Sequence, residues 1–134
     1  MIETENLLKE FTNMHDQFIR DWNKAMQTGD TSAVEKMADD YYVAFFKSGN
    51  EKPMFFNIDE AIDGMKQSVN HFLGASKNFE NRVIRLRNQN NAVVFFEQLI
   101  IKDEKVLARL FTIENWEIRN GEWKITREIE ESIH

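Results

Sequence analysis

The second half of the chain constrains the fold most, because from Asn78 onward it consists of runs of about ten residues separated by turns. The separators are NQNN at 88–91, KDEK at 102–105 and RNGE at 119–122. Asn120-Gly121, in the last of them, is the dipeptide most typical of a tight hairpin. The single proline, Pro53, lies outside these runs, so no strand loses a ladder hydrogen bond to it. The pattern predicts four long antiparallel strands in a meander.

Residues 3–28 predict a long amphipathic helix, because their apolar side chains recur at steps of three and four. Gly29 follows directly and is a typical C-terminal stop. His15 falls on or beside the apolar stripe, where a histidine is more often a hydrogen-bonded core residue than a catalyst. The stripe consists of Leu7, Phe11, Met14, Phe18, Trp22, Ala25 and Met26.

Two capping signals predict two further helices. Ser32 and Glu35 have the spacing of a capping box and would begin a short second helix. Asn57 and Glu60 repeat that spacing before an apolar pattern of helical period, which predicts a third helix. Between the two signals, the aromatic residues 41–47 predict a short strand.

Together these elements predict an α+β fold, with three N-terminal helices packed on an antiparallel sheet. The sheet would contain the four-strand meander and the short early strand. A chain of 134 residues is long enough to bury a core of its own, so one domain is expected over residues 1–134.

Charge and composition exclude several classes of function. The net charge of −6 argues against nucleic acid, because phosphate binding needs clustered Lys and Arg. The chain has no cysteine, which excludes disulfides and thiolate metal sites. The segment MIETENLLKE lacks the pattern of a signal peptide, and no apolar run reaches the roughly 20 residues of a membrane helix. We therefore expect a cytoplasmic domain with no nucleic-acid or membrane partner.

Two-residue turns would also set which side chains share a sheet face. Turns at Gln89-Asn90, Asp103-Glu104 and Asn120-Gly121 all agree on one inward apolar face. Within it, Arg82 would oppose Glu97, and Glu114 would oppose Arg127, as cross-strand ion pairs. Thr112 would also point inward. The apolar members would be Ile84, Leu86, Val93, Phe95, Leu99, Ile101, Leu110, Trp116, Ile118, Trp123, Ile125 and Ile129.

The opposite face would be mixed, with an apolar cluster at its centre. Solvated positions would include Glu128 and Glu130. The cluster would have no covering element, and exposed patches of this kind often mark an interface. We expect a homodimer packed through this face; the alternative is an exposed patch without a partner. The cluster consists of Phe96, Ile100, Leu107, Phe111 and Ile113.

Three segments resemble the nuclear transport factor 2-like (NTF2-like) superfamily. WNKAMQTGD at 22–30, followed by SAVEKMADDYYV at 32–43, is similar to the family's helix, Gly-Asp, helix, Asp-Asp, strand opening. NGEWKI at 120–125 resembles the last hairpin of the polyketide-cyclase-like branch. The resemblance covers nearly the whole chain and implies a strongly curved sheet wrapped around helices, the cystatin-like cone. The same fold hosts enzymes, binding proteins and scaffolds.

Position-by-position comparison with ketosteroid isomerase, a member of this superfamily, implies that its acid–base groups are replaced here. Trp22 stands where that enzyme has an oxyanion-hole tyrosine, and Phe45 stands where it has its catalytic aspartate. Thr112 stands where it has a protonated aspartate. Steroid isomerisation by that mechanism is therefore not expected. The implied ligand pocket is lined by Trp22, Phe45, Phe95, Thr112, Glu114, Trp116 and Arg127.

Three hypotheses about function follow. The first is a small-molecule-binding domain with an apolar pocket. The second is a cofactor-independent isomerase, cyclase or dehydratase in which Glu97 or Glu114 acts as general acid or base. The third is a dimeric structural module whose cone is filled by its own side chains and whose paired charges are ordinary ion pairs. No cofactor is expected, and the histidines lack metal-ligand spacing.

Overall fold

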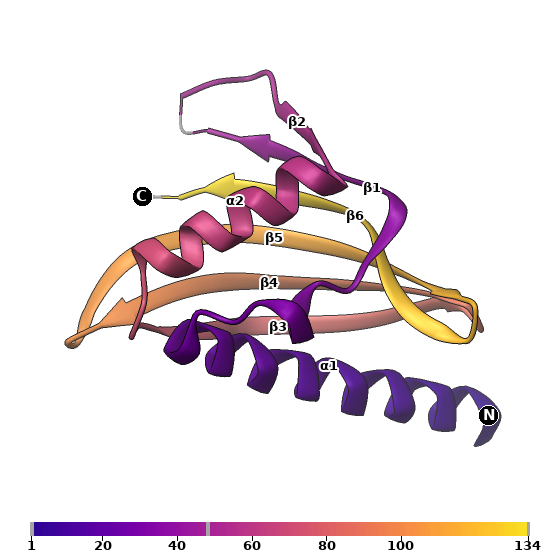
Figure 1. Ribbon diagram of the computed structural model, residues 1–134. Coiled ribbons are helices and arrows are strands. Elements are labelled where there is room, and N and C mark those ends of the chain that lie inside the picture. Colours follow the sequence, from indigo (N-terminus) through magenta and orange to yellow (C-terminus); the bar gives the residue numbers. More distant parts are fainter. Residues whose placement is uncertain (1, 48, 134) are drawn as a thin grey trace.

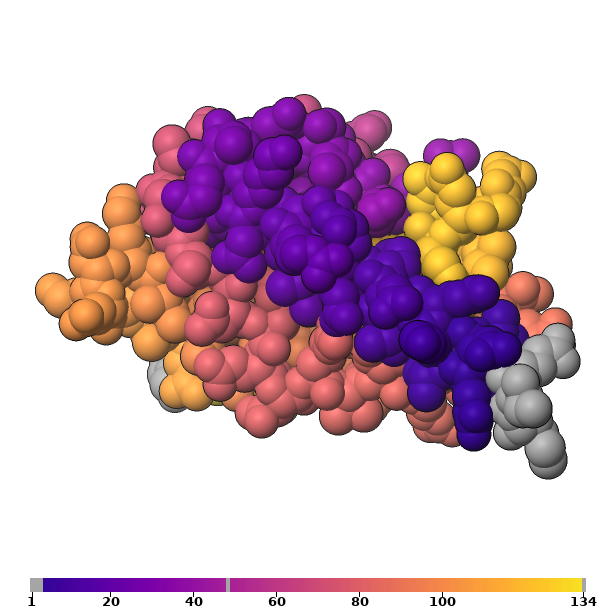
Figure 2. All heavy atoms as spheres, turned by 90° about the horizontal axis from the view of Figure 1, so that it is seen from below, coloured from indigo at the N-terminus to yellow at the C-terminus, as the bar shows by residue number. Residues whose placement is uncertain are grey.

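A computed structural model describes residues 2–47 and 49–133 of the chain. Within these residues, two α-helices and one turn of 3-10 helix pack on one mixed six-stranded sheet. In chain order the elements are α1 (Ile2–Thr28), η1 (Ser32–Val34), β1 (Met37–Phe46), β2 (Met54–Asn57), α2 (Ile58–His71), β3 (Ser76–Asn88), β4 (Asn91–Lys102), β5 (Lys105–Arg119) and β6 (Glu122–Ser132). The strand order is β2-β1-β6-β5-β4-β3. Both helices lie on one side of the curved sheet (Figure 1), which we call the inner face. Seen from below, α1 extends along β3 (Figure 2).

The first and third predicted helices are confirmed. α1 ends before Gly29, which adopts the left-handed φ of 83° that such a helix stop uses. Its apolar stripe buries Phe11 and Phe18 in the main core. α2 begins at the predicted capping box, in which the Asn57 side chain accepts from the Glu60 backbone N–H. The Glu60 carboxylate in turn accepts from the Asn57 backbone N–H.

The predicted second helix is wrong in extent. Only η1 forms, and the chain enters β1 at Met37, earlier than the predicted strand. Met37, Tyr41 and Val43 are buried in β1, which pairs in parallel with β6. Strand pairing and burial therefore outweigh the local capping signal. Because of this parallel pair the sheet is mixed rather than antiparallel, and β2 adds an edge strand beyond those predicted.

The three hairpin tips lie where the sequence predicts them, but bulges change the register beyond each tip. An extra residue interrupts the ladder at Arg87 in β3, at Leu107 in β5 and at Thr126 in β6. An extra residue moves the side chains that follow it to the opposite face. The pairs next to the tips are Asn88–Asn91, Lys102–Lys105 and Arg119–Glu122.

The bulges in β3 and β5 reverse the predicted faces of β4, the strand between them. Phe96 and Ile100 were expected on the outer face, yet they are buried in the inner core at 1% and 4% exposure. Phe95 was expected in the pocket, and it lies on the outer face with 38% exposure. Glu97 also lies on the outer face, where it forms an ion pair with Arg109 of β5. It does not face Arg82.

The bulge in β6 reverses the last part of that strand. In a regular strand Thr126 would oppose Asn115, and Arg127 would oppose Glu114 on the inner face; with Thr126 bulged out of the ladder, Arg127 opposes Asn115 and points outward. Glu128 takes the position opposite Glu114 instead, and Glu130 follows on the same side. Both glutamates were expected in solvent. The predicted Glu114–Arg127 pair is therefore wrong.

No helix within the described residues is both long and apolar enough to cross a membrane. The cytoplasmic location stays a prediction from the sequence.

Candidate functional site

A cavity of about 490 Å³ lies between the two helices and the inner face of the sheet. Most of its wall is apolar, with Trp22 from α1, Phe45 from β1 and Met65 from α2 among the lining side chains. Polar side chains enter it from five strands. They include Tyr41, Lys77, Gln98, Glu114, Glu128 and Glu130.

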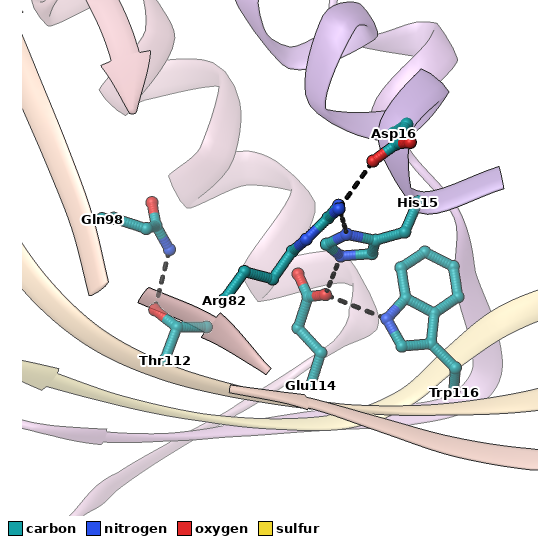
Figure 3. A network of polar contacts seen from close by, with 7 residues as sticks. All are labelled: His15, Asp16, Arg82, Gln98, Thr112, Glu114 and Trp116. Carbon is teal, nitrogen blue, oxygen red and sulfur yellow. Dashed lines mark hydrogen bonds and ion pairs between the residues drawn. The ribbon is translucent and has the colours of Figure 1, made fainter. Parts of the chain in front are cut away.

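Glu114 is held in place by two N–H donors. Its Oε1 atom lies 2.8 Å from Nε2 of His15 and accepts a hydrogen bond of 2.9 Å from Nε1 of Trp116 (Figure 3). Glu114 is 3% exposed, and His15 is fully buried. Neither hydrogen bond uses Oε2. The carboxylate is thus fixed through one oxygen while it lines the cavity.

The contacts of His15 determine its tautomer. Nη1 of Arg82 lies 3.0 Å from Nδ1 of His15, and Nη2 of the same guanidinium donates to Oδ1 of Asp16 at 2.7 Å. A guanidinium only donates, so Nδ1 must accept. The ring proton then sits on Nε2 and is donated to Glu114. His15 is consequently a neutral imidazole within a line of contacts from Asp16 to Trp116 (Figure 3).

Glu128 and Glu130 form the β6 side of the polar wall. The Tyr41 hydroxyl donates to Oε1 of Glu128 at 2.8 Å. Burial, and then the negative charges of Glu130 and Glu114, raise the pKa of Glu128 well above its usual range. Burial also raises the pKa of Glu130, with a further contribution from Glu114, against the lowering effect of Lys77. Burial and the neighbouring carboxylates raise the pKa of Tyr41.

Lys77 of β3 brings a cationic group to this cavity. Its Nζ lies 3.3 Å from the centroid of the Trp22 ring, a cation–π contact. Burial lowers the pKa of Lys77 to about 8, although Glu130 and Glu128 oppose the shift.

A buried amide completes the polar wall. Nε2 of Gln98 donates to Oγ1 of Thr112 at 2.8 Å, and both side chains are buried (Figure 3). Among the described residues, no three His, Cys, Asp or Glu side chains are arranged to hold a metal ion.

Similarity to solved structures identifies the architecture. No protein-family model and no curated protein matches the chain. An NTF2-like protein with a cystatin-like fold from Novosphingobium aromaticivorans superposes with a TM-score of 0.73 at 10% identity, over 98% of this chain and 88% of that one. The fold is that of the NTF2-like proteins.

Two further structures share this fold. A protein of unknown function with a cystatin-like fold from Nostoc punctiforme has a TM-score of 0.66 at 15% identity, over 87% of this chain and 86% of that one. A candidate ketosteroid isomerase from Parabacteroides distasonis has a TM-score of 0.56 at 18% identity, over 86% of this chain and 84% of that one. Identities this low establish the NTF2-like fold alone.

The NTF2-like cone gathers part of the predicted pocket. Trp22, Phe45 and Glu114 line the cavity. Thr112 and Trp116 are buried on the inner face and bind the cavity residues Gln98 and Glu114 rather than lining the cavity themselves. Two residues named for the pocket, Phe95 and Arg127, lie on the outer face, as does the catalytic candidate Glu97.

Five polar residues of the site were missed from the sequence. None of them was assigned to the pocket, although all five line the cavity: Tyr41, Lys77, Gln98, Glu128 and Glu130. The i, i+2 spacing of the two glutamates shows only that they share a face. Which face they take depends on the bulge at Thr126, for which the sequence gives no signal.

Proposed function

We propose that this chain is a small-molecule-binding domain whose ligand occupies the cavity of the cone. The observation that carries the proposal is the cavity itself. Its volume of about 490 Å³ lies within the roughly 300–1,000 Å³ of typical ligand sites. Its mostly apolar wall with a few converging polar groups is also typical of such sites. A cone filled by its own side chains, the structural alternative, would leave only voids near the size of a water molecule.

Gly64 of α2 offers a direct test, because it lines the cavity and no atom lies within 4 Å of the Cβ that a substitution would add there. We expect Gly64→Phe to fold and to lose binding of cavity ligands at least about tenfold, since the ring takes up ligand volume. Thermal shift with neutral apolar ketones measures this. Unchanged binding in Gly64→Phe would contradict the proposal.

Gly64→Ala is the matched control. We expect it to keep ligand binding and to raise the free energy of unfolding by about 0.5–1 kcal/mol, because glycine is unfavourable inside a helix. The pair of variants separates loss of cavity volume from a change in helix stability.

The second candidate function is general acid–base catalysis by Glu114 in a cofactor-independent isomerase, cyclase or dehydratase. It is favoured by the position of Glu114, whose Oε1 is occupied by two donors while Oε2 makes no hydrogen bond within the described residues. Glu97 is no longer a candidate, because it lies on the outer face. Turnover of a cavity ligand that survives Glu114→Gln would rule this function out, and Glu97→Gln is the matched control.

A further inference from the structure

Three carboxylates share one wall of the cavity, and the backbone register puts them close together. Glu114 of β5 and Glu128 of β6 are directly opposite partners, and Glu130 opposes Thr112 two positions further along. Side chains directly opposite across an antiparallel pair have Cβ atoms about 4.5–5.5 Å apart. Like charges in that arrangement destabilise a sheet. The fold therefore carries a cost here that a cation from outside would relieve.

The chain itself supplies few donors to these carboxylates. Glu128 accepts from Tyr41, and Glu114 accepts from His15 and Trp116 through one oxygen only. Within the described residues, Glu130 takes part in no hydrogen bond or ion pair. Lys77 lines the same cavity, but none of the ion pairs between described residues joins it to a carboxylate.

Gln98 adds a second and independent indication. This cavity-lining amide is only 5% exposed, and its Nε2 is used by Thr112. Its carbonyl oxygen accepts no hydrogen bond from any described residue. This oxygen is accessible rather than sealed in the core, so it is open to a donor carried by a cavity ligand. Apart from the ammonium of Lys77, which lies over the Trp22 ring, the free polar atoms on Gln98, Glu114 and Glu130 are acceptors.

We propose that the cavity selects an organic cation: a protonated amine on an aromatic or branched apolar body. An ammonium group offers three donors and no acceptor, which complements the free oxygens of Glu114, Glu130 and Gln98. The apolar body would pack against Trp22 and Phe45. A neutral alcohol would fit the walls but leave the carboxylate charges uncompensated. An organic acid would meet three carboxylates and only Lys77 in its favour.

This inference rests on the proposed ligand-binding function, and one experiment tests both. Tryptamine, tryptophol and indolepropionate share an indole body and differ in head group: ammonium, hydroxyl and carboxylate. Isothermal titration calorimetry at neutral pH measures the affinity of each. We expect tryptamine to bind at least about tenfold more tightly than tryptophol, and indolepropionate to bind most weakly.

Variants of the cavity carboxylates test which of them select the cation. Glu130→Gln and Glu128→Gln should each weaken tryptamine binding about tenfold and leave tryptophol binding unchanged. Glu131→Gln is the matched control, because Glu131 is exposed, lies next to Glu130 and opposes Phe111 on the outer face. It should change neither affinity. Circular dichroism confirms that each variant is folded.

The outcomes separate the two proposals. Equal affinities for tryptamine and tryptophol would overturn the selection for cations and keep the cavity as a ligand site. Insensitivity of tryptamine binding to both Glu128→Gln and Glu130→Gln would do the same. Tightest binding of indolepropionate would assign recognition to Lys77 instead and overturn the inference. Binding of none of the three would count against the cavity as a ligand site altogether.

Discussion

Glu128 and Glu130 hold their protons more tightly in the folded protein than in the unfolded chain, because burial and neighbouring carboxylates raise both pKa values. Stability from such groups is fully present below the ordinary carboxyl pKa and is lost as the pH rises through the raised values. At Glu128, the negative charge of Glu114 raises the pKa further, whereas the hydrogen bond from Tyr41 lowers it. Lys77, whose pKa is lowered to about 8, makes the free energy of unfolding rise with pH, but only above about that pH.

We therefore expect the free energy of unfolding to fall between about pH 5 and about pH 8. Glu130→Gln should be more stable than the wild type near the upper end of this range, and the difference should shrink near the lower end. Urea unfolding at both pH values measures this. Glu131→Gln, in solvent on the same strand, should follow the wild type. A Glu130→Gln variant with the wild-type pH dependence would contradict the assignment of the slope to this carboxyl.

Single residues of the site were predictable where their element was regular. Trp22 and His15 follow from the apolar stripe of α1, whose period of 3.6 residues is undisturbed over the whole helix. The partner of His15 could not be predicted, because Glu114 lies 99 residues away and meets it only through tertiary packing. Arg82 was expected to face Glu97, and it binds His15 and Asp16 instead.

At the level of the strands, bulges decide which side chains reach the cavity. A further bulge in β3, where Asn81 and Arg82 together face Phe96 of β4, places Asn81 at a φ of 56°, in the left-handed region. Asparagine tolerates this region and glycine adopts it freely, whereas β-branched residues do so only under strain. The bulge turns the next residue, Arg82, toward His15 of α1.

We expect Asn81→Val to lower the free energy of unfolding by about 1–3 kcal/mol and Asn81→Gly to leave it nearly unchanged. Asn78→Val is the matched control, because Asn78 is also an exposed asparagine of β3 but has no positive φ. It should be neutral or slightly stabilising, since valine is favoured in strands. Urea unfolding measures all three variants, and equal losses in Asn81→Val and Asn78→Val would show that the left-handed φ is not the cause.

The strands themselves and their hairpin tips were predictable, but their register was not. Residues 92–101 read AVVFFEQLII, which offers an apolar set on either face. Val93 and Phe95 fit an inward face as well as Val94 and Phe96 do, so alternation cannot choose between them. In β6 the apolar Ile129 even favours the wrong face. A hydrophobic pattern assumes an apolar interior, and this part of the interior is a polar cavity wall.

On the scale of the whole molecule, one apolar row crosses the outer face of the sheet from edge to edge. Successive members are direct cross-strand partners, so the row runs through all six strands. Several are well exposed, including Phe55 at 64% and Val83 at 53%. The row consists of Phe55, Ala44, Ile129, Ile113, Phe95 and Val83.

The homodimer stays a proposal, and the row revises the surface that would form it. Phe96 and Ile100 cannot belong to this surface, because they are buried in the inner core. Phe111 and Ile113 lie on the outer face as predicted, and Leu107 is exposed at the bulge in β5. A continuous apolar surface of this kind is typical of an interface. Two copies related by a two-fold axis would each cover the row of the other.

We expect sedimentation velocity at micromolar concentration to give twice the mass of one chain. Phe111→Lys should shift the protein to monomer, because Phe111 is 53% exposed beside the row and a buried unpaired charge is costly. Leu8→Lys is the matched control on α1, where Leu8 is 39% exposed, and it should not change the mass. A monomeric wild type would end the dimer proposal.

The bulge at Thr126 makes the charge of the cavity depend on the backbone conformation of one position. In a regular strand Thr126 would oppose Asn115, which would turn Arg127 and Ile129 inward and both glutamates outward, with the turn at Asn120-Gly121 and the strand order intact. Losing the bulge while keeping every residue would thus exchange an acidic lining for a basic and apolar one. Deleting Thr126 would have the contrary result, because Arg127 would still oppose Asn115 and both glutamates would stay in the cavity. In this cone, the same side chains can build two different ligand sites, and a single bulge selects between them.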